Sequence, residues 1–125
     1  MARILLVEDD PDVLPLMEHF LLDHGYAVTT AQTVAIAKIL LAAQPFDLAI
    51  CDVNLPDGSG LTVADAAMAR GVKALVVTGQ GLRLRPGSLS SYDYLLKPLR
   101  RHELIAGIER RLARTPDIAK SVTSL

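Results

Sequence analysis

The chain has 125 residues, of which 50% are apolar and 22% are charged. This length and balance indicate one folded domain with its own core, and they exclude a wholly disordered chain. Thirteen basic side chains against fourteen acidic ones leave a formal charge of −1, so no global field attracts nucleic acid or an anionic membrane, and we expect neither as a direct partner.

The single cysteine, Cys51, excludes an internal disulfide, and no apolar run is long enough to span a bilayer. The amino terminus has a strand pattern that ends in acids instead of the apolar segment of a secretion signal. We therefore expect a reducing, cytoplasmic location.

Five short apolar runs follow one another along the chain and predict five strands. They occupy residues 4–7, 26–30, 48–51, 74–77 and 92–96. The first, third and fourth runs are continuous, which is typical of strands that are buried on both faces of a sheet.

Helical patterns fill most of the intervals between these runs. We expect Asp12 to cap the first helix, Pro15 to lie in its first turn and Gly25 to end it. Thr33 should cap the second helix and Ser59 the third, because a side-chain hydroxyl can accept a hydrogen bond from a free backbone N–H of the first turn.

The last helix should follow Pro98 and end near Thr115. Before it, residues 79–91 are rich in glycine, serine and proline and lack helical periodicity, so a loop or at most one helical turn is expected there. The alternation predicts an α/β fold: a doubly wound, five-stranded parallel sheet of flavodoxin-like order 2-1-3-4-5, with its fourth helix reduced or replaced by a loop.

Polar side chains follow four of the five runs, where the carboxyl ends of parallel strands meet at one edge of the sheet. These side chains are Glu8, Asp9, Asp10, Asp52, Thr78 and Lys97. Carboxylates that lie so close raise one another's pKa unless a cation neutralises them, which suggests a site for a hard divalent ion such as Mg²⁺. Acids, a hydroxyl and an ammonium together suit phosphoryl transfer.

Four segments at these strand ends resemble the receiver domain of two-component response regulators. They are VEDD at 7–10, CDVNLPDGSG at 51–60, VVTG at 76–79 and YDYLLKPL at 92–99. The resemblance runs from Arg3 to about Arg114 and implies a receiver domain over residues 1–115. Residues 116–125 would be a tail without an output domain, so the chain is either a single-domain regulator or a part of a larger protein.

The resemblance also implies a role for each site residue. Asp52 would accept a phosphoryl group from a phosphohistidine on a partner histidine kinase or phosphotransfer protein. Asp9, Asp52 and the backbone carbonyl of Asn54 would ligate Mg²⁺, with Glu8 acting through metal-bound water. Lys97 would pair first with Asp52 and later with the phosphoryl group.

Thr78 and Tyr94 would form the switch that the resemblance implies. The hydroxyl would move toward a phosphoryl oxygen while the ring turns inward, and a downstream protein would bind the changed surface. The chain would then be a regulatory domain that assists its own phosphorylation and dephosphorylation, and not a separate enzyme. The family's cis peptide bond before Pro98 is expected as well.

An aspartate-nucleophile phosphohydrolase is the alternative, because Asp10 and Asp12 flank Pro11 after a strand, as in the Asp-x-Asp opening of that superfamily. That interpretation leaves Asp52 without a role and finds no late acidic pair to hold the metal. A flavin mononucleotide binder shares the fold, but its phosphate needs small polar residues where this chain has acids. A signalling switch is the favoured interpretation.

Overall fold

The sheet and its strand order are those predicted. The computed structural model describes residues 1–79 and 92–113. Its main sheet has the order β2-β1-β3-β6-β7, with every neighbouring pair parallel. The strands are β1 (Arg3–Val7), β2 (Ala27–Ala31), β3 (Leu48–Asp52), β6 (Lys73–Thr78) and β7 (Tyr94–Leu96). Since β6 and β7 are the fourth and fifth strands of this sheet, the flavodoxin-like order 2-1-3-4-5 is confirmed.

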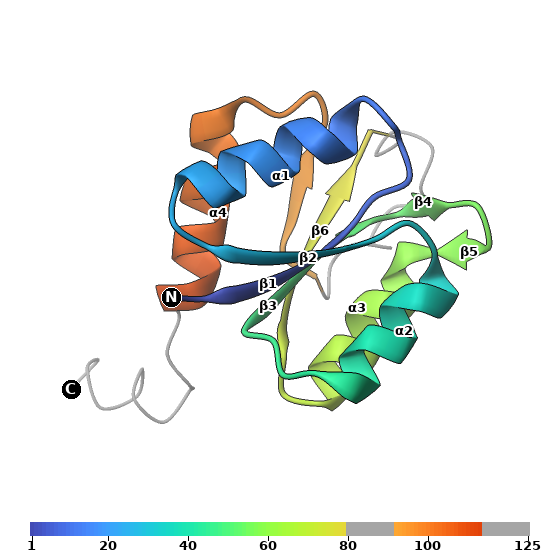
Figure 1. Ribbon diagram of the computed structural model, residues 1–125. Helices are drawn as coiled ribbons and strands as arrows, with labels where there is room; N and C mark the ends of the chain where they lie inside the picture. The colour runs from blue at the N-terminus through green and yellow to red at the C-terminus, as the bar shows by residue number, and fades with distance from the viewer. Residues whose placement is uncertain (80–91, 114–125) are drawn as a thin grey trace.

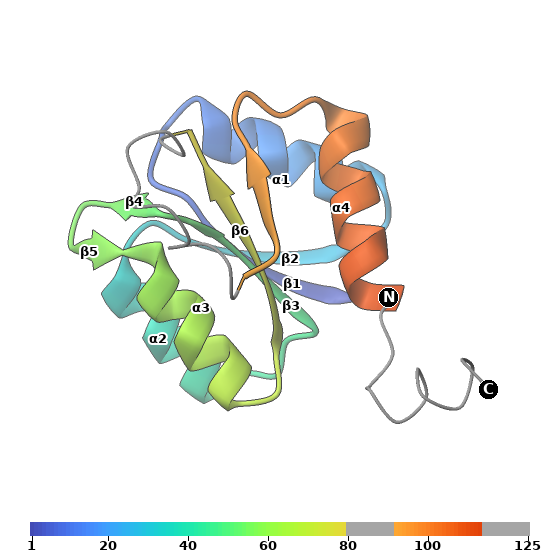
Figure 2. The same cartoon turned by 180° about the vertical axis from the view of Figure 1, so that it is seen from behind.

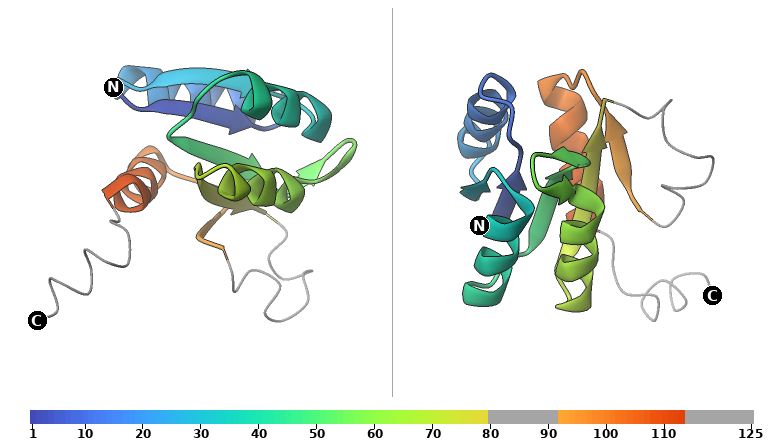
Figure 3. Two further views of the ribbon diagram at one scale, coloured as in Figure 1. Left: turned by 90° about the horizontal axis from the view of Figure 1, so that it is seen from below. Right: turned by 90° about the vertical axis from the view of Figure 1, so that its right-hand side faces the viewer.

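Two pairs of helices cover the sheet. α1 (Val13–Asp23) and α4 (Arg101–Ala113) lie side by side on one face, and α2 (Val34–Ala43) and α3 (Gly60–Ala69) lie side by side on the other (Figures 1 and 2). In Figure 3 the sheet runs between the two pairs. None of the helices in the described ranges is long and apolar enough to cross a membrane.

The central strands are buried on both faces, as their continuous apolar runs predicted. In β1, Leu5 and Val7 pack in the apolar cluster with α2 and α3, whereas Ile4 and Leu6 pack in the cluster with α1 and α4. Successive side chains of a strand point to opposite faces, so each strand supplies both clusters. The sheet therefore separates two apolar cores.

Two of the three predicted helix caps are confirmed. The hydroxyls of Thr33 and Ser59 accept backbone N–H groups at the starts of α2 and α3, at 3.0 and 3.1 Å. The prediction for Asp12 is wrong, because its side chain makes no capping bond. Oδ1 of Asp10 accepts the N–H groups of Asp12 and Val13 instead, at 2.8 and 3.2 Å, since an aspartate can close a turn onto the backbone two residues further on.

The structure contains a short antiparallel hairpin that the sequence pattern did not predict. Its strands, β4 (Asn54–Leu55) and β5 (Gly58–Ser59), lie between β3 and α3. The last strand of the main sheet is also shorter than predicted, because β7 begins at Tyr94. The hydroxyl of Tyr92 donates to Asp65 Oδ1 on α3, at 2.8 Å, which holds that side chain outside the strand.

The described residues contain four helices, none of them between β6 and β7. The loop predicted at 79–91 falls outside the described residues except for Gly79, and so do the predicted tail at 116–125 and the end of the last helix near Thr115. The peptide bond between Lys97 and Pro98 is cis, as expected.

Candidate functional site

The strand alternation brings Glu8 and Asp52 to the same side of the sheet. Leu6 of β1 and Ile50 of β3 are paired in register, and both pack toward α1 and α4. Glu8 lies two residues beyond Leu6, and Asp52 lies two residues beyond Ile50. Because side chains two apart in a strand share a face, the two carboxylates project from the end of this face.

Three carboxylates meet at this edge. One oxygen each from Glu8, Asp9 and Asp52 lie within 4.8 Å of one another. Glu8 is 1% exposed and Asp52 is 7% exposed, whereas Asp9 is open to solvent. A compact set of carboxylate oxygens with one exposed member is the donor chemistry that a hard divalent cation such as Mg²⁺ prefers. The residues present therefore fit the predicted ion.

Lys97 directly follows β7 and reaches the carboxylate cluster along the same edge of the sheet. Its backbone N–H donates to the carbonyl of Thr78 at 2.9 Å, which fixes the residue beside β6. Its ammonium lies 3.1 Å from Asp52 Oδ2, the predicted partner, and 2.6 Å from Glu8 Oε1. The closer contact with Glu8 was not predicted, although the position of Glu8 two residues beyond a buried leucine indicated that it points the same way.

The charges of this cluster depend on one another. Burial raises the pKa of Glu8 above its ordinary value and the neighbouring Asp52 acts in the same direction, while the hydrogen bond from Lys97 opposes both. Burial alone would lower the pKa of Lys97, but its contacts with Glu8 and Asp52 outweigh burial and raise it. The lysine is therefore held in its charged form beside the two acids.

The residues that follow Asp52 are packed tightly against it. The N–H of Asn54, the first residue of β4, donates to Asp52 Oδ1 at 3.3 Å. The N–H of Gly60 donates to the carbonyl of Val53 at 2.8 Å. A Cβ atom on Gly60 would lie 1.7 Å from the carbonyl oxygen of Asp52, so only glycine fits there.

The two predicted switch residues lie on neighbouring strands. Thr78 ends β6, is fully buried and pairs in register with Leu96 of β7. Tyr94, two residues earlier on β7, is 48% exposed. The structure thus places the ring on the surface and the hydroxyl residue inside, and their roles as a switch stay a prediction.

Two other acids and the cysteine lie outside the cluster. Asp10 and Asp12, the residues of the phosphohydrolase alternative, are both exposed and do not belong to the described group of carboxylates within 4.8 Å. Asp10 accepts the N–H groups of Asp12 and Val13, and these bonds lower the pKa of its carboxyl. Cys51 is fully buried, and burial raises the pKa of its thiol to about 12.

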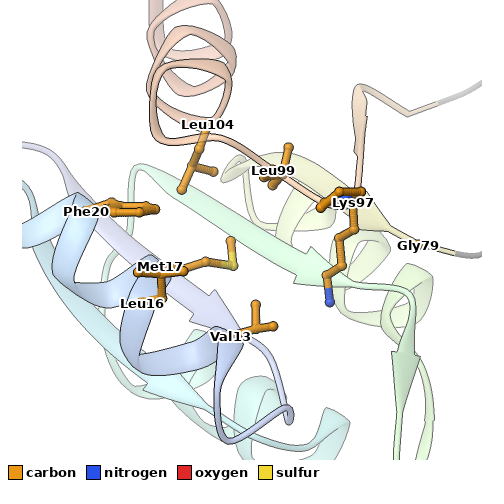
Figure 4. A pocket seen from close by; sticks show the side chains of 9 residues that line it. Val13, Leu16, Met17, Phe20, Gly79, Lys97, Leu99 and Leu104 are labelled. Atoms are coloured by element: carbon orange, nitrogen blue, oxygen red, sulfur yellow. The ribbon is translucent and has the colours of Figure 1, made fainter.

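An apolar pocket of 430 Å³ opens beside the carboxylate cluster, between α1 and the start of α4 (Figure 4). Lys97 stands at one end of it, with its amine pointing away from Leu104. The sequence pattern did not predict this pocket. Its other lining residues include Val13, Leu16, Met17, Phe20 and Leu99.

Known proteins share this arrangement of elements. Residues 4–109 match the family described as response regulator receiver domain. The TorCAD operon transcriptional regulatory protein TorR of Escherichia coli O157:H7 is 31% identical over 122 residues, which cover 94% of this chain and 53% of that protein. This chain thus spans about half the length of that relative. Because TorR is named as a transcriptional regulator, the expectation that nucleic acid is no direct partner is not supported.

Solved structures agree with this match. The receiver domain of the sensor histidine kinase PA1611 from Pseudomonas aeruginosa PAO1, with a magnesium ion coordinated in its active-site cleft, has a TM-score of 0.79 at 27% identity and covers 90% of this chain and 98% of that one. The response regulator TrrA from Thermotoga maritima, in complex with Mg²⁺ and BeF, has a TM-score of 0.79 at 27% identity. The match covers 88% of this chain and 98% of that one.

Proposed function

Because the chain belongs to the response regulator receiver domain family, we propose that it is a cytoplasmic, phosphorylation-dependent signalling switch whose Asp52 accepts a phosphoryl group. The donor is a phosphohistidine on a partner histidine kinase or phosphotransfer protein. The observation that carries this proposal is the contact of the Lys97 ammonium with Asp52, at 3.1 Å, inside a cluster of three carboxylates.

Asp52 is the nucleophile of the proposed transfer. One carboxylate oxygen attacks the phosphorus in line with the P–N bond of the phosphohistidine. A P–O bond forms as the P–N bond breaks, and the electron pair leaves with the imidazole nitrogen. Asp52 has a small exposed area at the edge of the sheet, so a donor can approach it without opening the core.

The other side chains of the edge hold and offset charge. Asp9, Asp52 and the carbonyl of Asn54 would hold a Mg²⁺ ion, which supplies positive charge against the phosphoryl oxygens when bound. Lys97, whose ammonium lies 3.1 Å from Asp52 Oδ2, supplies a second positive charge. The relatives' structures that contain magnesium support this choice of ion.

The output of the switch depends on Thr78 and Tyr94. The Thr78 hydroxyl donates to a phosphoryl oxygen, and the exposed Tyr94 ring turns inward on the neighbouring strand. A local hydrogen bond thereby changes the surface that a downstream protein binds, which is how a small covalent change acts at a distance.

Phosphorylation in vitro tests the proposal. Incubation with acetyl phosphate and Mg²⁺ should give one phosphoryl adduct, seen by intact mass spectrometry and lost on standing. Asp52→Asn should give no adduct, and chelation of Mg²⁺ should abolish labelling of the unchanged chain.

Asp10→Asn is the matched control, because Asp10 is a neighbouring acid whose carboxylate caps α1. It should keep the adduct. An adduct that survives Asp52→Asn and disappears in Asp10→Asn would refute the proposal in favour of the phosphohydrolase.

A further inference from the structure

Asp57, at the tip of the β4–β5 hairpin, takes no part in the proposed phosphoryl transfer, but its side chain contacts the start of α2. Its Oδ1 accepts the N–H of Val34 at 2.8 Å, and its Oδ2 accepts the N–H of Ala35 at 3.0 Å. These are the first two amides of α2, which have no partner within the helix. The N–H of Ile36 is bonded by Thr33, so α2 is capped by one side chain from its own segment and by one from the hairpin.

The hairpin is fastened at both ends. At its base, Gly60 lies against the carbonyl of Asp52 and donates to Val53. At its tip, Asp57 holds α2, and a Cβ atom added to Gly58 would contact Val34 at 3.7 Å. Figures 1 and 3 show the hairpin extending from the carboxyl end of the sheet toward the start of α2. A two-residue antiparallel pair has little stability of its own, so these attachments define where it lies.

Asn54 lies between the two attachments. It pairs with Ser59 across the hairpin, and its N–H donates to Asp52 Oδ1. Any shift of the hairpin tip is passed to this residue through the short strands, because only two residue pairs separate the tip from the base. The attachment at the tip therefore acts, together with the base, on the position of the Asn54 backbone beside Asp52.

We propose that Asp57 is a positioning residue for the phosphoacceptor site: by fastening the hairpin to the start of α2, it holds the backbone of Asn54 in place to bind Mg²⁺ beside Asp52. This inference rests on the proposed function, which assigns the carbonyl of Asn54 to the ion. Groups that orient metal ligands from outside the coordination shell commonly affect affinity strongly.

Two variants of the same helix start separate positioning from stability. Asp57→Ala removes the tip attachment, whereas Thr33→Ala removes only the local cap of α2 and leaves the hairpin attached. We expect Asp57→Ala to weaken Mg²⁺ binding roughly 3- to 10-fold, less than the 10–100-fold loss for a group that touches a ligand directly. Asp57→Asn, which retains one acceptor oxygen, should lie between Asp57→Ala and the unchanged chain. Thr33→Ala should leave the affinity unchanged.

Mg²⁺ affinity is measured by titration of the metal alone, followed through backbone amide shifts. Hydrogen exchange in the metal-free protein gives a second reading, in which the amides of residues 54–59 exchange faster in Asp57→Ala and at the unchanged rate in Thr33→Ala. Equal weakening by both alanine variants would overturn the inference, and so would full Mg²⁺ affinity in Asp57→Ala.

The proposed function can fail separately from this inference. If acetyl phosphate never labels Asp52 while Asp57→Ala still weakens Mg²⁺ binding and Thr33→Ala does not, the phosphorylation proposal is wrong and the positioning role of Asp57 stands. If the unchanged chain binds no Mg²⁺, both are wrong.

Discussion

The two faces of the sheet are covered by helix pairs that pack in different ways. On the α2–α3 face, Ala37, Ala64 and Ala67 are fully buried and let both helices close onto the strands. On the α1–α4 face, a pocket of 430 Å³ remains between the helices. Polar contacts cross the outer edge of that face: Arg101 pairs with Asp23, and its guanidinium lies 5.6 Å from the ring centre of Phe20.

This difference shows where the molecule is able to rearrange. The carboxylates of Glu8 and Asp52 extend the α1–α4 face, and Lys97 both lines the pocket and contacts them. The close-packed α2–α3 face instead holds the hairpin through Asp57. Close-packed interiors resist small displacements, whereas a side chain beside unfilled space moves without disturbing its neighbours. The proposed positioning of the site therefore depends on one face, and the proposed change of partner by Lys97 would take place beside the pocket of the other.

The largest expected effect is that of Gly60→Ala, and Gly107→Ala is the matched substitution on the other face. On the α3 side, the Cβ of Gly60→Ala would lie 1.7 Å from a backbone oxygen of Asp52, so the backbone must move, and we expect a loss of about 3–5 kcal/mol. On the α4 side, the Cβ of Gly107→Ala would meet the end of the flexible Leu95 side chain at 2.9 Å. The helix propensity of alanine offsets that crowding, so we expect a change within about 1 kcal/mol.

Denaturant unfolding of the two alanine variants measures both changes. Comparable losses would show that the two faces are equally intolerant of added volume, and the contrast between them would not hold. A folded Gly60→Ala variant with normal stability would also contradict the backbone approach between α3 and Asp52.

The sheet and the convergence of acids were predictable because both follow from local sequence patterns. Continuous apolar runs predict buried parallel strands, and the acids directly after them must share an edge. The choice between Asp10 and Asp12 as the cap of α1 was not predictable, since both have the same intrinsic preference for that position. Propensity ranks residue types, and it does not distinguish two neighbouring aspartates.

The contacts of Asp57 and Glu8 differ in how far the sequence could predict them. Asp57 bonds to amides more than twenty residues earlier in the chain, and no local pattern links the two segments. These contacts could therefore not be predicted from the sequence. Glu8 was different, because its place two residues beyond Leu6 already indicated burial on the α1–α4 face. Side chains alternate between the two faces, so continuing this alternation past the end of β1 would have placed Glu8 on the α1–α4 face, where it contacts Lys97.

Lys97→Ala tests the charge balance at the end of the α1–α4 face. The change leaves Glu8 buried beside Asp52 without a cation, and in the metal-free protein we expect a loss of about 1–3 kcal/mol near neutral pH. This is less than for a fully buried pair, because the Lys97 side chain is 23% exposed. Lys38→Ala, an exposed lysine on α2, is the control on the other face and should change little.

The pH dependence of Lys97→Ala has a definite sign. Burial already raises the pKa of Glu8, and the loss of Lys97 removes the contact that opposes this rise. The folded state then binds a proton more readily than the unfolded chain. Stability lost at neutral pH should return as the pH falls through the raised folded-state pKa toward the ordinary range of glutamate. Urea unfolding from about pH 8 to about pH 4.5 measures it, and a loss that does not vary with pH would contradict the role of Glu8.

Arg101→Ala has the smallest expected effect and tests the outer edge of the α1–α4 face. The Arg101 guanidinium lowers the pKa of Asp23 below its ordinary value. A lowered pKa means that the pair stabilises the fold above the unfolded-state pKa and that this contribution disappears as the pH falls through the folded-state value. The loss on Arg101→Ala should be smaller than that of Lys97→Ala, because both partners are exposed, and it should shrink in acid.

Thermal unfolding at neutral and acid pH, with Arg100→Ala as an exposed control, separates the two contacts of Arg101. If the loss shrinks in acid, the ion pair with Asp23 joins α1 to α4. If it stays constant, the contact of the arginine with the Phe20 ring carries the effect, since that contact does not titrate. The outer edge of the α1–α4 face would then be held without a titrating ion pair. The difference between the two faces would reduce to the pocket and the carboxylates beside it.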